Sequence, residues 1–149
     1  MVKIAIGCDH GGYVLKEGII KLLQDRGIEV ADKGCNGESV DYPDYALAVA
    51  KDVSSGACDK GILLCGTGIG ISIAANKVKG IRCAVCHDVF TASMCSAHNN
   101  ANILAMGGRV LNQEQADAMV AAWLDTPFEG GRHCGRVDKI SAIESEYFK

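Results

Sequence analysis

The sequence predicts a three-layer α/β/α sandwich built around a five-stranded parallel sheet. Short apolar runs alternate along the whole chain with amphipathic segments whose apolar residues recur at helical spacing. Within the runs, apolar residues occupy both faces instead of alternating with polar ones, which is typical of parallel strands covered by helices on both sides. Successive strands are therefore expected to be joined by right-handed crossovers.

Five segments are expected to be strands. They are KIAIGC (3–8), IEVADK (28–33), GILLCG (61–66), IRCAVC (81–86) and NILAMG (102–107). Helical periodicity follows each of them. The expected buried faces of three helices are Leu15, Ile19 and Leu22, then Tyr45, Val49 and Val53, and then Met119, Val120 and Trp123. Pro43 fits the first turn of the second helix, where its missing N–H costs nothing.

The composition fits one domain that spans residues 1–149. With 48% hydrophobic residues and a net charge of -3, the chain can bury a core and offers no basic face for nucleic acid. Its first residues lack the apolar region of a signal peptide, and no apolar stretch is long enough to span a bilayer. A cytoplasmic protein without nucleic-acid or membrane partners is therefore expected.

The eight cysteines are expected to be reduced thiols. The chain is too long and too rich in aliphatic residues to depend on disulfides. Cys83 and Cys86 form a CxxC pair inside an expected strand, so their side chains would point to opposite faces. A redox or zinc function for this pair is disfavoured, since a redox pair begins a helix and a zinc site needs further ligands.

Residues able to do chemistry gather at one edge of the predicted sheet. In parallel α/β folds, ligands bind beyond the carboxyl ends of the strands, near a topological switch point. The side chains at strand ends or in the loops that follow them are Asp9, His10, Asp41, Tyr42, Cys65 and Arg109. Cys58 and Arg82 fall near strand starts and are expected at the opposite edge, away from the ligand.

The turn CGTGIG after the third expected strand is the most informative motif. Gly66, Gly68 and Gly70 allow backbone N–H groups to face inward at the start of a helix, where an anion is stabilised. The spacing differs from the dinucleotide fingerprint, and the chain has no Gly-Lys step of a P-loop. Because a thiol at a helix N-terminus readily becomes a thiolate, Cys65 is the best candidate base. A cysteine that only fills space beside tightly packed glycines is the alternative.

Two arginines near the C-terminus indicate a phosphate site. Arg132 and Arg136 in GGRHCGR lie four residues apart, so on a helix they share a face and can hold one phosphate group. A surface charge pair is the alternative. Arg109, which follows a strand, is a third candidate for binding an anionic substrate. His10 follows the first expected strand at the ligand edge, where a solvated loop residue is the alternative.

His98 belongs to the polar segment SAHNNAN, which closes a helix before the fifth expected strand. An acid–base function for His98 competes there with a capping function for Asn99 or Asn100. His87 has no evident partner. No HxH or HxxE spacing occurs, so no metal site is expected.

Five motifs together resemble the ribose-5-phosphate isomerase B family. They are GCDHGG, DYPDYA, CGTGIGISIAANK, AHNNANILAMGGR and GGRHCGRVDKI, and they follow the family's order over essentially the full chain. The resemblance implies a Rossmann-like fold and a homodimer, or a tetramer, whose active sites are shared between chains. It implies no cofactor and no metal. The C-terminal helix of this sugar-phosphate isomerase domain is expected to contribute to the dimer.

The activity that the resemblance implies is the interconversion of ribose 5-phosphate and ribulose 5-phosphate by proton transfer through an enediolate. Family members use as base either a cysteine before the glycine turn or a glutamate in the following helix, and SIAANK contains no glutamate, so Cys65 is implied. Isomerases of allose 6-phosphate and galactose 6-phosphate belong to the same family and stay open as alternatives. Outside the family, the alternatives are a phosphate-binding regulatory module and a thiol-dependent redox protein.

The resemblance also implies a role for each site residue. Ring opening is assigned to His98 and Asp9. The enediolate oxygen is assigned to the Thr67 side chain and the backbone N–H groups of Gly66, Thr67, Gly68, Ile69 and Gly70. The phosphate is assigned to His10, Arg109, Arg132 and Arg136, and the sugar hydroxyls to Tyr42 and Asn99. Because sites are shared, His98, Asn99 and Arg109 can serve a different pocket from the one that contains Cys65 of the same chain.

Overall fold

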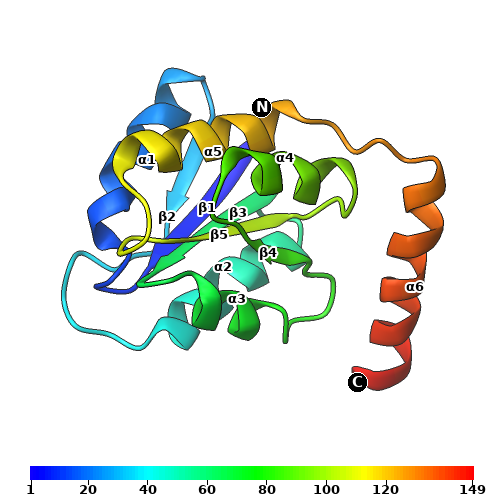
Figure 1. The fold of residues 1–149 in the computed structure, drawn as a ribbon. Coiled ribbons are helices and arrows are strands. Elements are labelled where there is room, and N and C mark those ends of the chain that lie inside the picture. The colour runs from blue at the N-terminus through cyan, green and yellow to red at the C-terminus, as the bar shows by residue number, and fades with distance from the viewer.

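A computed structural model describes residues 1–149 and confirms the three-layer α/β/α fold with five parallel strands (Figure 1). The strands are β1 (Lys3–Cys8), β2 (Glu29–Asp32), β3 (Lys60–Cys65), β4 (Cys83–Val85) and β5 (Ile103–Gly107). The helices are α1 (Tyr13–Asp25), α2 (Tyr42–Ser54), α3 (Ile69–Ala75), α4 (Val89–Ala97), α5 (Gln113–Asp125) and α6 (Arg132–Tyr147). The strand order across the sheet is β2-β1-β3-β5-β4.

Two apolar clusters, one on each face of the sheet, form the core. Helices α1, α4 and α5 cover one face and α2 and α3 cover the other, as Figure 1 shows. Consecutive strand residues belong to opposite clusters: Leu64 belongs to the cluster that contains Trp123 of α5, whereas Leu63 belongs to the cluster that contains Val49 of α2. Strands apolar on both faces are explained by this double covering.

The edge strand β4 is shorter than the six residues predicted. Its outer side has no neighbouring strand, and the side chain of Asn76 takes that place: it donates to the Cys83 carbonyl at 2.9 Å and accepts from the Cys83 N–H at 2.8 Å. The strand begins at Cys83, where Asn76 binds, and the predicted strand residues Ile81 and Arg82 precede it. Cys83 and Cys86 contact opposite clusters, as the strand periodicity predicts.

The buried face of α1 differs from the predicted one. Leu15 and Ile19 are buried, but the third apolar contact is Leu23 rather than the half-buried Leu22. Lys16 is also fully buried, and its ammonium group donates to the Asp32 carboxylate at 3.0 Å and to the Cys35 carbonyl at 2.6 Å. Burial by itself would lower the pKa of Lys16, but the hydrogen bonds and charge of Asp32 outweigh it and raise the pKa.

The other predicted helix faces are confirmed with one difference. Val49, Val53, Met119, Val120 and Trp123 are buried, while Tyr45 is half-buried and packs against the cluster opposite to that of Val49 and Val53. Pro43 lies in the first turn of α2, as predicted.

The chain order creates a topological switch point between β1 and β3. The connection from β1 through α1 leads outward to β2, and the connection from β2 through α2 leads back past β1 to β3. The carboxyl ends of β1, β3 and β5 lie side by side, since Cys8 is in register with Leu64 and Cys65 with Gly107. Ligands of such folds bind at this edge.

Helix α6 stands apart from the sandwich, beyond β4 (Figure 1). His133 is its only buried residue. A cavity of about 430 Å³ separates its apolar side chains, among them Ile140 and Ile143, from Ala84 of the edge strand and from Ile81 just before it. No helix is both long and apolar enough to cross a bilayer.

Candidate active site

Cys65 ends β3 and lies beneath the glycine turn. Its side chain is buried, and its sulfur accepts a hydrogen bond from the N–H of Gly68 at 3.1 Å. Gly68 adopts the left-handed conformation, with φ 84, and precedes the first residue of α3. A Cβ atom at Gly68 would lie 2.9 Å from the backbone of Met106 in β5. The turn can therefore wrap over the sulfur only with glycine at this position.

Replacing Gly68 with alanine is expected to destabilise the protein by about 1–3 kcal/mol, because the variant must strain its backbone and also push against a neighbouring strand. Gly27→Ala is the matched control: Gly27 has φ 75 but nothing within 4 Å of its Cβ position. Its cost is expected to be limited to about 1 kcal/mol of backbone strain. Urea unfolding measures both, and equal losses would mean that packing against Met106 contributes nothing.

The backbone amides of the turn divide into two sets. Of the five expected to line an anion hole, Gly68 N–H donates to Cys65 Sγ and Ile69 N–H donates to Thr67 Oγ1 at 3.2 Å. The N–H groups of Gly66, Thr67 and Gly70 donate to no acceptor in the chain. Three unsatisfied donors beside a cysteine sulfur can bind an oxyanion.

Asp9 follows β1 and lies against this turn. Its carboxylate Oδ1 accepts from the N–H groups of Gly11 at 2.8 Å and Gly12 at 3.1 Å, which fixes the side chain. A Cβ atom at Gly11 would lie 3.0 Å from the nitrogen of Gly66, so the two loops pack backbone to backbone. Asp9 is buried, and no hydrogen bond within the chain involves its Oδ2. A carboxylate oxygen is thus available to a ligand.

Two further predicted residues flank the turn. A Cβ atom at Gly66 would lie 3.1 Å from Arg109 Nη1, and one at Gly70 would lie 2.9 Å from the Tyr42 hydroxyl oxygen. The arginine and the tyrosine therefore stand at the two ends of the glycine turn. His10 lies nearby on the β1 loop, where its Nδ1 accepts from the N–H of Val40 at 3.3 Å.

The remaining predicted residues lie at the opposite edge of the sheet. His98 caps the C-terminus of α4, just before β5 begins. The guanidinium group of Arg82, which precedes β4, donates to the carbonyls of Asn99 and Asn100 at 3.1 and 2.9 Å and holds this turn. Asn100 has φ 48 and is the asparagine that takes the left-handed conformation after the helix.

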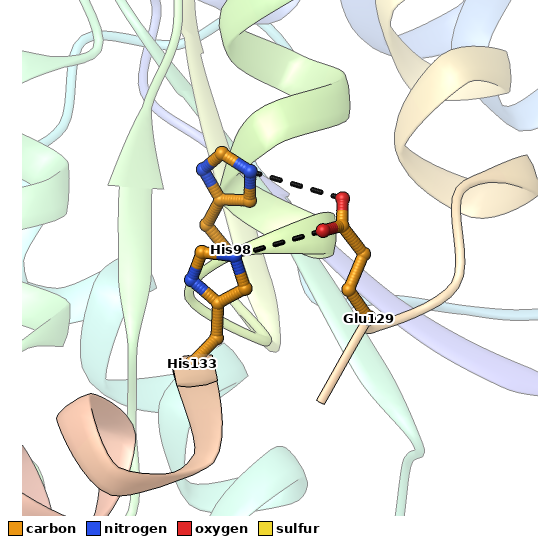
Figure 2. A group of neighbouring side chains, drawn as sticks. All are labelled: His98, Glu129 and His133. Carbon is orange, nitrogen blue, oxygen red and sulfur yellow. Dashed lines mark ion pairs between the residues drawn. The ribbon is translucent and has the colours of Figure 1, made fainter. Parts of the chain in front are cut away.

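His98 is part of a group that also contains Glu129 and His133 (Figure 2). The two imidazole rings are stacked, with centroids 4.2 Å apart and planes inclined by 14°. Glu129 lies 3.8 Å from Nε2 of His98 and 3.6 Å from Nε2 of His133. Burial lowers the pKa of His133, and the charges of His98 and Arg132 lower it further. Arg132 and Arg136 start the same helix, α6.

Sequence reasoning missed Glu129 and His133. His133 lies inside the motif GGRHCGR, between the two predicted phosphate ligands, and that position was the only available signal. Glu129 precedes the motif in a loop, and only the folded path of that loop brings it to His98.

The predicted site residues therefore form two groups within one chain. Asp9, His10, Tyr42, Cys65, Thr67 and Arg109 lie where strands end, and His98, Asn99, Arg132 and Arg136 lie where β5 begins. Arg109 stands with Cys65 of its own chain, apart from His98 and Asn99, with which it had been grouped. The five residues of β5 separate the two edges by roughly 16 Å.

Comparison with known proteins decides the family. A family model described as Ribose/Galactose Isomerase matches residues 4–140. The chain belongs to this family. It is 53% identical to ribose-5-phosphate isomerase B of Escherichia coli (strain K12), over 97% of each chain. It is 45% identical to D-erythrulose-4-phosphate isomerase of Pectobacterium atrosepticum, over 98% of this chain and 97% of that protein.

The family's solved structures have the same fold. The ribose-5-phosphate isomerase B of Clostridium thermocellum matches with a TM-score of 0.96 and 56% identity, over 98% of this chain and 99% of that chain. The family resemblance carried by the five motifs is thereby confirmed, and members of this family are aldose–ketose isomerases of sugar phosphates.

Proposed function

We propose that this chain is a ribose-5-phosphate isomerase that interconverts ribose 5-phosphate and ribulose 5-phosphate, with Cys65 as the base. Its high identity to ribose-5-phosphate isomerase B proteins along the full chain supports the substrate. The observation that carries the mechanism is the position of Cys65: its sulfur accepts the Gly68 N–H, and three unsatisfied amides lie on the same turn. The sulfur and the amides that would hold the enediolate oxygen thus belong to one turn, as this proton transfer requires.

The chemical step moves one proton between neighbouring carbons. The Cys65 thiolate takes the proton from C2 of the open-chain aldose, and the electron pair of the C–H bond forms the C1–C2 double bond of an enediolate. The negative charge develops on the carbonyl oxygen, which the N–H groups of Gly66, Thr67 and Gly70 stabilise together with the Thr67 side chain. The thiol then returns the proton to C1, and the 2-hydroxyl proton moves to O1, which yields the ketose.

The rest of the proposed site comes from a second copy of the chain. His98 and Asp9 open the sugar ring, but they lie at opposite edges of one chain, too far apart to act on one sugar. A homodimer, alone or within a tetramer, that places His98, Asn99, Arg132 and Arg136 of one chain over Cys65 of the other brings them together. The exposed apolar residues of α6, Ile140 and Ile143, support a contribution of this helix to the dimer.

The remaining roles follow from position. Arg132 and Arg136, with His10 and Arg109 from the facing chain, hold the phosphate group. Tyr42 beside Gly70 and Asn99 hold the sugar hydroxyls. The proposed proton transfer needs no cofactor or metal, and a cytoplasmic location belongs to the same proposal.

The test compares the purified protein on ribose 5-phosphate, allose 6-phosphate and galactose 6-phosphate, with and without a chelator. We expect the highest kcat/KM with ribose 5-phosphate and no change on chelation. A higher kcat/KM for another sugar phosphate would contradict the proposed substrate but leave the proposed mechanism unchanged. Binding without turnover of any of them would favour a phosphate-binding module, and loss of activity on chelation would contradict proton transfer by Cys65 alone.

A further inference from the structure

The group of His98, Glu129 and His133 contains an unsatisfied nitrogen. His133 Nε2 is buried and has no hydrogen-bond partner, and the side chain is only 6% exposed. The nearest carboxylate oxygen, on Glu129, is 3.6 Å away, which is beyond hydrogen-bond distance. Figure 2 shows one nitrogen of each ring, Nε2, directed at the Glu129 carboxylate. A buried polar atom without a partner is costly, so an occupant that satisfies it is favoured.

We propose that His98, Glu129 and His133 form a binding site for a divalent transition-metal ion, and that Zn²⁺ is the ion these side chains fit best. One ligand atom of each residue lies within 4.8 Å of the other two. Two imidazole nitrogens and a carboxylate are a common three-residue ligand set for zinc, and imidazole excludes Mg²⁺ and Ca²⁺ as preferred occupants.

The distances fit such an ion after small movements. With metal–ligand bonds of about 2.1 Å, two ligands of a tetrahedral ion lie roughly 3.4 Å apart. The separations from Glu129 to the two imidazoles are already 3.6 and 3.8 Å. His133 is held by burial, whereas the side chains of His98 and Glu129 are 38% and 53% exposed and can turn toward a shared ion.

The backbone brings these residues together. Glu129 N–H donates to the Ala97 carbonyl at 3.0 Å, and Ser96 Oγ donates to the Thr126 carbonyl at 2.5 Å, so the loop before α6 is tied to the end of α4. A hollow of about 380 Å³, lined by Glu129, Gly130, Gly131, Arg132 and His133, lies open beside the group. It gives room for water as the fourth ligand. Arg132 faces the same hollow, and its positive charge weakens cation binding, so a reversible site is expected.

The consequence for activity rests on the proposed function, whereas metal binding does not. A metal bound to Nε2 of His98 occupies the lone pair that ring opening requires. Zn²⁺ is therefore expected to inhibit the isomerase reversibly, and a chelator is expected to restore the rate.

The binding test uses the full chain, freed of metal by dialysis against a chelator. Co²⁺ is titrated while its visible d–d absorption is recorded, and Zn²⁺ binding is measured by calorimetry. We expect one ion per chain and the intense absorption of a tetrahedral Co²⁺ site. Glu129→Gln, at an exposed side chain, is expected to weaken Zn²⁺ binding at least about tenfold, and His133→Asn to do the same.

Cys134→Ser is the matched control, because Cys134 is exposed and adjacent to His133. It is expected to leave binding unchanged. A sulfur-to-cobalt charge-transfer band, loss of binding in Cys134→Ser, or unchanged binding in Glu129→Gln would each overturn the proposed ligand set.

The activity test separates the two proposals. Zn²⁺ is expected to inhibit the unchanged protein, and Glu129→Gln, compared with its own metal-free rate, is expected to need at least about tenfold more Zn²⁺ for the same inhibition. Binding of one metal ion per chain without any turnover of ribose 5-phosphate would contradict the proposed function and support the metal site. Turnover of ribose 5-phosphate without such metal binding would contradict the metal site and support the proposed function.

Discussion

Cys65→Ala is expected to lower kcat for ribose 5-phosphate by roughly 10²–10⁴-fold, the usual contribution of a positioned base. Alanine removes the sulfur that is proposed to take the C2 proton, while the unsatisfied amides of the turn and the proposed phosphate ligands are kept. KM is therefore expected to change little. Steady-state kinetics in both directions measures the loss, and circular dichroism checks that the fold is intact.

Cys58→Ala is the matched control for this variant. Cys58 is also a buried cysteine, but it lies before β3, at the other end of the strand that Cys65 terminates. Burial raises the pKa of its thiol, with the charge of Asp52 adding to the effect, so it stays protonated. The kcat of the Cys58→Ala variant is expected to equal that of the unchanged protein. A Cys65→Ala variant that kept its rate, or equal losses in the two variants, would remove Cys65 from the mechanism.

The rule that ligands bind beyond the carboxyl ends of parallel strands located the group around Cys65, one of the two groups of predicted site residues, from sequence alone. Cys65 ends β3, Asp9 and Arg109 follow β1 and β5, and these three strands are neighbours in the sheet. Any parallel sheet with this order brings their loops together, so apolar runs and their flanking residues contain enough information. The same rule placed Cys58 and Arg82 at the opposite edge, where Arg82 donates to the carbonyl of Asn99 in the second group.

Contacts that depend on the path of a loop could not be predicted in this way. His98 and His133 stack although 35 positions separate them, and the loop before α6 has no periodicity that fixes its direction. The buried Lys16 was missed for a related reason: its partners, Asp32 and the Cys35 carbonyl, come from the far end of β2 and the loop beyond. Cys8 and Cys35, with sulfurs 3.9 Å apart, are a third case.

A mixed dimer tests whether active sites are shared. Cys65→Ala and His98→Asn chains, carrying different tags, are expressed together, and the heterodimer is isolated by two affinity steps. If Cys65 of one chain works with His98 of the other, one site of the heterodimer carries both changes and the other carries none. The heterodimer is then expected to have about half the activity of the unchanged dimer, although each homodimeric variant is nearly inactive.

Active sites that are not shared between chains predict a lower activity for the heterodimer. If Cys65 and His98 of the same chain served one site, each site of the heterodimer would carry one change, and its rate would not exceed the mean of the two homodimeric variants. A heterodimer of unchanged and Cys65→Ala chains controls for the tags, since one intact site is expected under either arrangement. The roughly 16 Å between the two edges of the sheet makes restored activity the expected result, because only a second chain can bring His98 to Cys65.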